Sequence, residues 1–165
     1  MDLGRVFKHL LVPPWLVTRA FPKHVLDAIG AAITASERTH DGELRFVVEE
    51  GLDPWAVLKG QTPRERAIEL FSMLRVWDTA NNSGVLIYVQ LVDHRIEIIA
   101  DRGIEAKVRH EEWEEICRRM EQAFKRGEFE GGALLAIESI TALLARHFPP
   151  MAANRDELPD APIVV

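Results

Sequence analysis

The 165-residue sequence contains a single cysteine, Cys117, so no disulfide can form within the chain. It also lacks a run of about 20 apolar residues, the length that a membrane-spanning helix needs. The apolar stretch over residues 10–17 is interrupted by Pro13 and Pro14 and has no small-residue cleavage site, so we predict neither a signal peptide nor an anchor there. Together these absences favour a cytoplasmic protein.

Two kinds of binding signature are missing as well. The chain has no Gly-x-Gly-x-x-Gly fingerprint and no P-loop, so no nucleotide cofactor is predicted. Its formal net charge of -6 gives no electrostatic reason to expect nucleic acid as a partner. Hydrophobic residues at 47% and charged residues at 28% are typical of a globular domain, and the length fits one domain.

The chain divides into three parts. We predict an N-terminal segment over residues 1–21, one domain over residues 22–148 and a flexible tail over residues 149–165, which is rich in proline, alanine and aspartate. The N-terminal segment is basic and apolar. It is predicted either to pack on the domain as a short helix or to contact a membrane surface or a protein partner.

Helical and strand patterns alternate along the domain. A strand is predicted over Glu43–Glu49, with Leu44, Phe46 and Val48 on one face. Helices are predicted from Pro22, from the Thr62–Glu65 capping box, from His110 to Phe124 and from Ala133 to Arg146, with a break in the chain over residues 127–132. Cys117 lies within the apolar stripe of the third of these helices, which favours a packed thiol over a nucleophile.

Two β-rich runs, residues 84–92 and Arg95–Ala100, are separated only by Asp93 and His94 and predict a β-hairpin. The hairpin follows a strand and a helix, so the first hairpin strand is expected to run parallel to Glu43–Glu49. The order of elements predicts a mixed sheet of about four strands between helices, an α/β/α sandwich.

This topology brings polar residues from three segments to one edge of the sheet. Residues that precede the two parallel strands would lie beside those that leave the hairpin. We call this set the predicted rim, which comprises Glu37, His40, Asp41, Asp78, Asn81, Asn82, Asp101 and Arg102.

Glu37 needs a partner of its own. It continues the Leu26, Ile29 and Ile33 stripe by one turn, so its carboxylate either faces the core near a helix C-terminus or turns to solvent where the helix frays. If it faces the core, an arginine, a metal ion or backbone amides must compensate its charge.

The same residues carry a family resemblance. The patterns Ser36-Glu37-x-x-His40-x-Gly42-Glu43, Asn81-Asn82-Ser83-Gly84-Val85-Leu86, Asp93-His94-Arg95 and Asp101-Arg102-Gly103-Ile104 resemble the TPM-domain family, as does the ending Phe-Lys-Arg-Gly-Glu-Phe-Glu-Gly-Gly. The likeness covers roughly residues 22 to 148.

The resemblance implies an α/β/α sandwich with a Rossmann-like outline. Some relatives bind calcium, and a plant thylakoid branch is assigned acid phosphatase activity. Many bacterial relatives have a signal peptide and a transmembrane tail. We expect this chain to belong to the shorter soluble bacterial branch without them, whose biochemical role the resemblance leaves undefined.

The predicted rim supports two site hypotheses. Calcium, or magnesium, would be held by oxygen ligands from Glu37, Asp78, Asn81, Asn82 and Asp101. The alternative for these residues is that they form ordinary turns and ion pairs.

In the second site hypothesis, phosphatase chemistry would use Asp101 with Arg102 and Arg38 as phosphate clamps, and His40 as a general acid if it lies on the rim. No residue pattern fixes a nucleophile, and Asp93 is expected at the opposite end of the hairpin.

Three functions therefore follow from the sequence. The first is a binding or accessory module, metal-dependent in one version, which serves a protein partner that the sequence does not identify. The second is a metal-assisted phosphatase. The third is a scaffold whose N-terminal segment docks a partner or a membrane.

Overall fold

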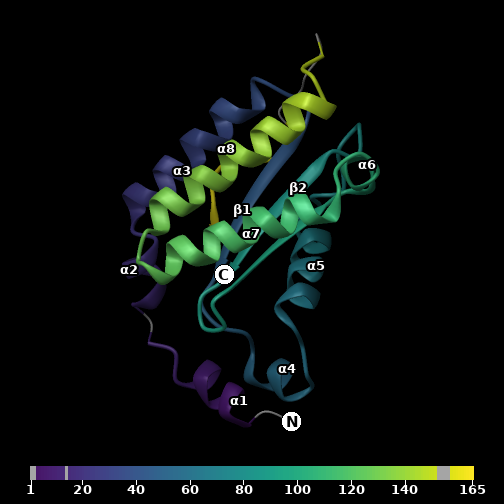
Figure 1. Cartoon of the computed structure of the whole chain (residues 1–165). Coiled ribbons are helices and arrows are strands. Elements are labelled where there is room, and N and C mark those ends of the chain that lie inside the picture. Colours follow the sequence, from purple (N-terminus) through teal and green to yellow (C-terminus); the bar gives the residue numbers. More distant parts are fainter. Residues whose placement is uncertain (1–2, 14, 152–156) are drawn as a thin grey trace.

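The computed structural model describes residues 3–13, 15–151 and 157–165. Figure 1 shows a twisted sheet with helices on both faces. The helices are α1 (Leu3–Leu10), α2 (Leu16–Ala20), α3 (Lys23–Glu37), α4 (Pro54–Leu58), α5 (Pro63–Met73), α6 (Arg102–Glu105), α7 (His110–Lys125) and α8 (Phe129–His147). The strands are β1 (Glu43–Glu49), β2 (Gly84–Gln90), β3 (Arg95–Ala100) and β4 (Ile163–Val164).

The sheet has the order β3-β2-β1-β4. β1 runs parallel to β2, with Glu43 opposite Gly84, and β2 pairs with β3 in an antiparallel hairpin, with Val85 opposite Ala100. The predicted parallel pair, the hairpin and the mixed sheet are therefore confirmed. The start of β1, the start of β2 and the end of β3 lie at one edge of the sheet.

Each face of the sheet has its own apolar core because side chains alternate along the strands. On one face, Leu44, Phe46 and Val48 of β1 pack under α7 and α8, and α3 lies beside α8. On the other face, Val47 of β1 packs with α5 and with Leu158 near the C-terminus. This arrangement of helices around a mixed sheet confirms the predicted fold class.

The capping box at the start of α5 is present as predicted. The hydroxyl of Thr62 accepts a hydrogen bond from the backbone amide of Glu65, and the Glu65 carboxylate accepts one from the amide of Thr62. These two contacts satisfy amides that the first turn of a helix leaves without partners.

The predicted break before the last helix is wrong over residues 129–132, which belong to α8. Gly132 lies where α8 approaches α7, and a Cβ atom there would be 2.8 Å from the Cβ of Ala123. This glycine therefore serves helix packing, although its sequence context is typical of a loop.

The C-terminal residues also differ from the prediction. The sequence predicted a flexible tail over residues 149–165, of which residues 152–156 lie outside the described part. Residues 157–165 pack along the sheet: Leu158 is buried, and Ile163 and Val164 pair with β1 as the edge strand β4. A two-residue strand is too short to give a periodic sequence pattern.

The opposite end of the molecule, beyond the β2–β3 turn, carries α1 and α4 side by side (Figure 1). None of the helices in the described ranges is long and apolar enough to cross a membrane.

Candidate functional site

Three loops meet where β1 and β2 begin. The amide of Glu43 donates to the carbonyl of Ser83 over 3.1 Å, and the amide of Asp101 donates to the carbonyl of Gly84 over 2.9 Å. The hydroxyl of Ser83 donates to the carbonyl of Asp41 over 2.9 Å, and the side-chain amide of Asn81 donates to the Asp41 carboxylate. We call this set the observed rim, which comprises Asp41, Asn81, Asn82, Ser83, Asp101 and Gly103.

Asp101 holds the best-defined position on the observed rim. Its Oδ1 accepts a hydrogen bond of 2.7 Å from the backbone amide of Arg102 and so caps α6. Its Oδ2 is buried and has no hydrogen-bond partner among the described residues. An unsatisfied buried carboxylate oxygen is costly, which makes it a candidate ligand.

Two backbone carbonyl groups converge on Gly103, two residues after Asp101. A Cβ atom built on Gly103 would lie 2.6 Å from the carbonyl oxygen of Asn82 and 2.8 Å from that of Asn81. Asn82 has a φ of 51°, a left-handed conformation that asparagine tolerates. The turn therefore points two carbonyl oxygens at the start of α6, and only a glycine at position 103 leaves room for them.

Asp78 and the two arginines have different surroundings. Asp78 forms an ion pair with Arg75 within its own turn and is half-exposed. Arg38 and Arg102 are exposed. None of these three side chains has a contact that ties it to Asp101 or Asp41.

Glu37 does not join the observed rim. Its Oε1 accepts a hydrogen bond of 2.9 Å from the amide of Leu44. That amide faces the β4 side of β1, because the amide of the preceding residue, Glu43, faces β2. β1 and β2 lie between Glu37 and the strand that ends at Asp101, a separation of roughly 14 Å at the usual strand spacing.

The Glu37 carboxyl is buried, which is one of the two alternatives that the helical stripe left open. The hydrogen bond from the Leu44 amide and protonation of the carboxyl both reduce the cost of burying it. The pKa of Glu37 is raised to about 9, mainly by burial, against which the Leu44 amide acts, and with smaller contributions from the neighbouring carboxylates of Glu43 and Asp160. Glu37 is therefore a neutral cap on the open edge of β1 at neutral pH.

His40 is fully buried, so the condition under which it would act as a general acid is not met. Its Nδ1 accepts from the amide of Gly42 over 3.2 Å, which places the ring proton on Nε2, 2.7 Å from Ser36 Oγ. Ser36 in turn contacts Thr141 of α8. Burial lowers the pKa of His40 to about 4, so the ring is neutral at pH 7 and joins Ser36 of α3 to the backbone just before β1.

In the described part of the chain, no three side chains of the histidine, cysteine, aspartate or glutamate type lie close enough together to hold a metal ion. A cation on the observed rim would therefore depend on carbonyl and amide oxygens as well as carboxylates, a mixture that calcium accepts.

A second polar cluster, which the sequence did not predict, lies at the hairpin end. Asp93 in the turn accepts hydrogen bonds from Arg5 at 2.7 Å and contacts His9 Nε2 at 3.1 Å. Burial raises the pKa of Asp93, but Arg5 and His9 outweigh that effect and hold it below its ordinary value. The spacing of four residues between Arg5 and His9 is the only sequence signal for this cluster.

Comparison with known proteins places these observations in a family. The family model described as the TPM domain matches residues 19–143. The solution structure of the BA42 protein from the psychrophilic bacterium Bizionia argentinensis is similar, with 30% identity and a TM-score of 0.76 over 86% of this chain and 93% of that one. No curated protein matches. The chain belongs to the TPM-domain family.

Proposed function

We propose that this protein is a non-catalytic binding module whose observed rim binds one calcium ion. The single observation that carries the proposal is the buried Oδ2 of Asp101, which has no hydrogen-bond partner among the described residues. A cation is the natural partner for such an oxygen, because it removes the cost of an unsatisfied buried carboxylate.

The other ligands come from the adjoining turn. The carbonyl oxygens of Asn81 and Asn82 converge at Gly103, two residues after Asp101, and the carboxylate of Asp41 contacts the Asn81 side chain. Calcium takes six to eight oxygen ligands with flexible geometry, so two carboxylates, two carbonyl groups and water molecules fit its chemistry. Magnesium demands a stricter octahedral arrangement, and we expect weaker binding of it.

Titration calorimetry of the full chain with calcium tests the proposal. With only two carboxylates, we expect one site with a Kd of about 10⁻⁴–10⁻³ M. Calcium at about ten times the Kd should raise the free energy of unfolding by about 1.4 kcal/mol. Asp101→Asn should weaken binding by at least about tenfold and still fold, because asparagine caps a helix as well as aspartate does.

Asp78→Asn is the matched control. It removes the same charge from an exposed acid of the adjoining loop, which pairs with Arg75. We expect its calcium affinity to stay within about twofold of the wild type, since exposed charges contribute little. The proposal is wrong if the wild type shows neither heat nor a thermal shift at roughly 10 mM calcium, well above the expected Kd.

Phosphatase activity is the alternative that the sequence raised. It would need a metal-activated water and clamps from Arg38 or Arg102. The burial of His40 removes the general acid from that scheme, and no observation favours catalysis over binding. Turnover of a generic phosphate ester that Asp101→Ala abolishes would establish the hydrolase and overturn the non-catalytic assignment. We keep the cytoplasm as the proposed compartment, because the chain's single thiol, Cys117, requires no oxidising environment.

A further inference from the structure

Helix α1 turns polar side chains towards the rest of the molecule. His9 is buried, and its Nδ1 accepts a hydrogen bond of 2.9 Å from the amide of Leu52. Arg5 lies one turn earlier on the same face and donates to Asp93 at 2.7 Å and to the carbonyl of Gln61 at 2.8 Å. The inner face of α1 is therefore held by hydrogen bonds and by the ion pair between Arg5 and Asp93.

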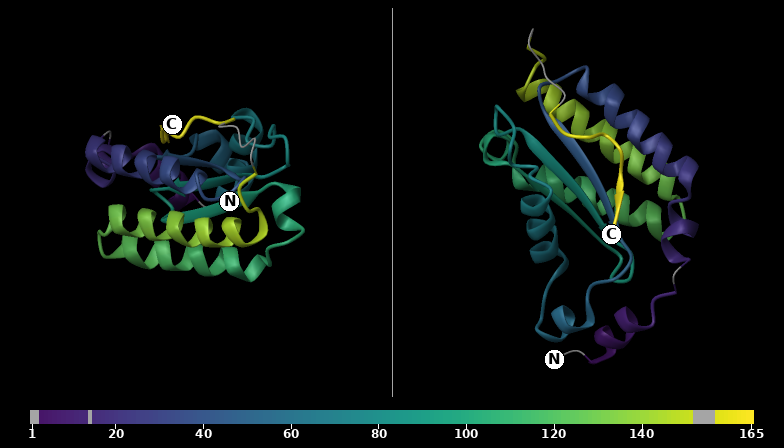
Figure 2. Two further views of the ribbon diagram at one scale, coloured as in Figure 1. Left: turned by 90° about the horizontal axis from the view of Figure 1, so that it is seen from above. Right: turned by 180° about the vertical axis from the view of Figure 1, so that it is seen from behind.

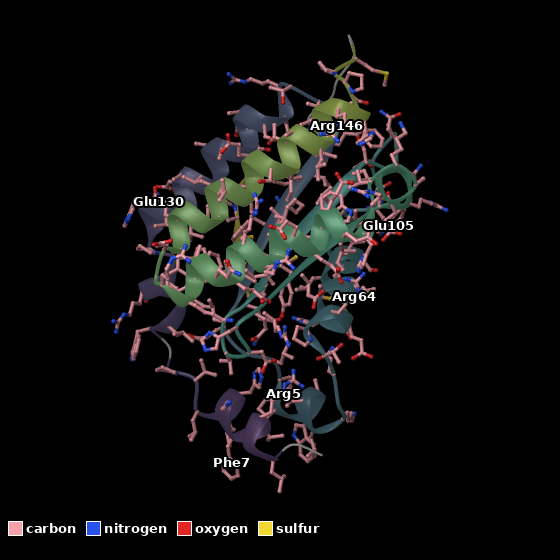
Figure 3. All side chains as sticks on the ribbon, viewed as in Figure 1. Arg5, Phe7, Arg64, Glu105, Glu130 and Arg146 are labelled. Carbon is pink, nitrogen blue, oxygen red and sulfur yellow. The ribbon has the colours of Figure 1, made fainter. Side chains whose placement is uncertain are left out.

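The outer face of α1 is apolar. The exposed fractions are 55% for Leu3, 60% for Phe7, 60% for Leu10 and 73% for Leu11. Figure 3 shows Phe7 on the side of α1 that faces away from the sheet and Arg5 on the side towards it. A helix on a water-exposed surface normally has the reverse arrangement, so this face is suited to a contact that removes it from water.

The apolar surface continues past the helix. A shallow groove of about 510 Å³ lies between α1 and the β2–β3 turn. Its apolar walls come from Phe7 and Leu11 on one side and from Leu91 and Val92 on the other, and Leu16 also lines it. The exposed patch is thus broader than one helix face.

The same segment is basic although the whole chain is acidic. Residues 3–20 contain Arg5, Lys8 and Arg19 and no aspartate or glutamate, whereas the chain carries a net charge of -6. Lys8 and Arg19 are exposed. The Arg19 guanidinium lies 5.6 Å from the ring centre of Trp15, which is 52% exposed. Tryptophan beside a basic residue is typical of groups that sit at the level of lipid headgroups.

We propose that α1 and the residues around Trp15 and Arg19 dock on the surface of an anionic lipid bilayer, with Phe7, Leu10 and Leu11 inserted at the headgroup boundary. The positive charge of Lys8 and Arg19 complements anionic lipid. A second copy of the chain would place the same basic residues near each other across a two-fold axis, which is unfavourable. A protein partner would need a groove, because α1 forms a projecting end of the molecule (Figure 1).

The surface is largely additional to the family domain, since the match to the TPM model begins at residue 19. No described helix can cross a bilayer, so the contact would be peripheral.

Flotation of the full chain with vesicles tests the proposal. The protein should float with vesicles of phosphatidylcholine and phosphatidylglycerol, bind pure phosphatidylcholine vesicles at least about tenfold more weakly, and dissociate as salt is raised. The double variant Phe7→Glu and Leu11→Glu should lower binding by at least about tenfold. Both side chains are exposed, so its circular dichroism and melting temperature should match those of the wild type.

Leu135→Glu is the matched control. It makes one apolar-to-glutamate change, against two in the variant, at a side chain of α8 that is 47% exposed, and it should leave vesicle binding unchanged. Failure of the wild type to float with anionic vesicles overturns the proposal, as does binding that survives the Phe7 and Leu11 changes. A concentration-dependent dimer that these changes dissociate, without any vesicle binding, would instead assign the surface to a second copy.

Discussion

The two ends of the β-sheet are held together by different kinds of interaction. Where β1 and β2 begin, backbone groups join the loops, with contributions from the side chains of Ser83 and Asn81: the carbonyls of Ser83 and Gly84 accept from the amides of Glu43 and Asp101. At the hairpin end, side chains make the connection. The carboxylate of Asp93 binds both Arg5 and His9, which lie 88 and 84 positions earlier in the sequence.

The difference explains what each end presents to its surroundings. The contacts at the observed rim leave Oδ2 of Asp101 without a hydrogen-bond partner among the described residues. At the hairpin end the charged groups neutralise one another inside the fold, and apolar side chains such as Phe7 face outwards. One end is therefore suited to a cation and the other to an apolar surface.

The largest effect is expected from a change that breaks the backbone packing next to the observed rim. A Cβ atom on Gly84 would lie 1.9 Å from the carbonyl oxygen of Val76, so Gly84→Ala must push the two segments apart. We expect a loss of about 3 kcal/mol or more in the free energy of unfolding, measured by chemical denaturation.

Gly131→Ala is the control for that substitution. Gly131 lies in α8, and a Cβ atom there would have no neighbour within 4 Å. Alanine should stabilise the helix by about 0.5–1 kcal/mol. Equal stability of the two alanine variants would show that the contact with Val76 does not constrain this end of the sheet.

A smaller effect is expected at the hairpin end. Asp93→Ala removes the carboxylate that Arg5 and the buried His9 bind. We expect this change to lower the free energy of unfolding by about 2 kcal/mol. Amide hydrogen exchange should become faster in α1 and stay unchanged at residues 81–84. The control is Asp27→Ala in the exposed Lys23–Asp27 pair, which should lower the free energy of unfolding by less than about 0.5 kcal/mol. A similar loss of stability in both variants would contradict a special role for Asp93.

The smallest effect concerns Glu37, which belongs to neither end. Its pKa is raised to about 9 in the folded protein from its ordinary value of 4.5, so the folded state binds more protons between these values. The wild type therefore loses stability as the pH rises from about 4.5 to 9.

Glu37→Gln removes that loss and keeps the oxygen that accepts from Leu44. We expect the free energy of unfolding of the variant, relative to that of the wild type, to be at least about 1 kcal/mol higher at pH 8 than at pH 5, because only the wild type loses a proton on unfolding over this range. The advantage should shrink towards pH 5 in denaturation curves. An advantage that is constant with pH would mean that Glu37 is ionised in the folded state.

Local patterns in the sequence predicted much of the fold. The capping box of α5, the hairpin and the parallel pairing of β1 with β2 all depend on contacts between near neighbours or on simple rules of chain connection. The same rules predicted correctly that residues near Gly84 and Asp101 meet at one edge.

The errors have a common physical cause, which is that they depend on contacts between distant segments. Gly132 resembles a loop residue until α7 packs against it. Glu37 lies on the helical stripe as expected, but the direction of the Leu44 amide carries its carboxyl to the β4 side of the sheet, away from Asp101. The contact between Arg5 and Asp93 joins residues 88 positions apart, so no local pattern predicts that these two residues pair.

The most direct test of the calcium proposal is a nitrogen–proton correlation spectrum of the labelled protein during titration with calcium chloride. Calcium binding at the observed rim should produce saturable shifts confined to the amides of residues 41–43, 81–84 and 101–104, with the hairpin end and α1 unchanged. Shifts that are absent, or that cluster away from Asp101, would contradict it.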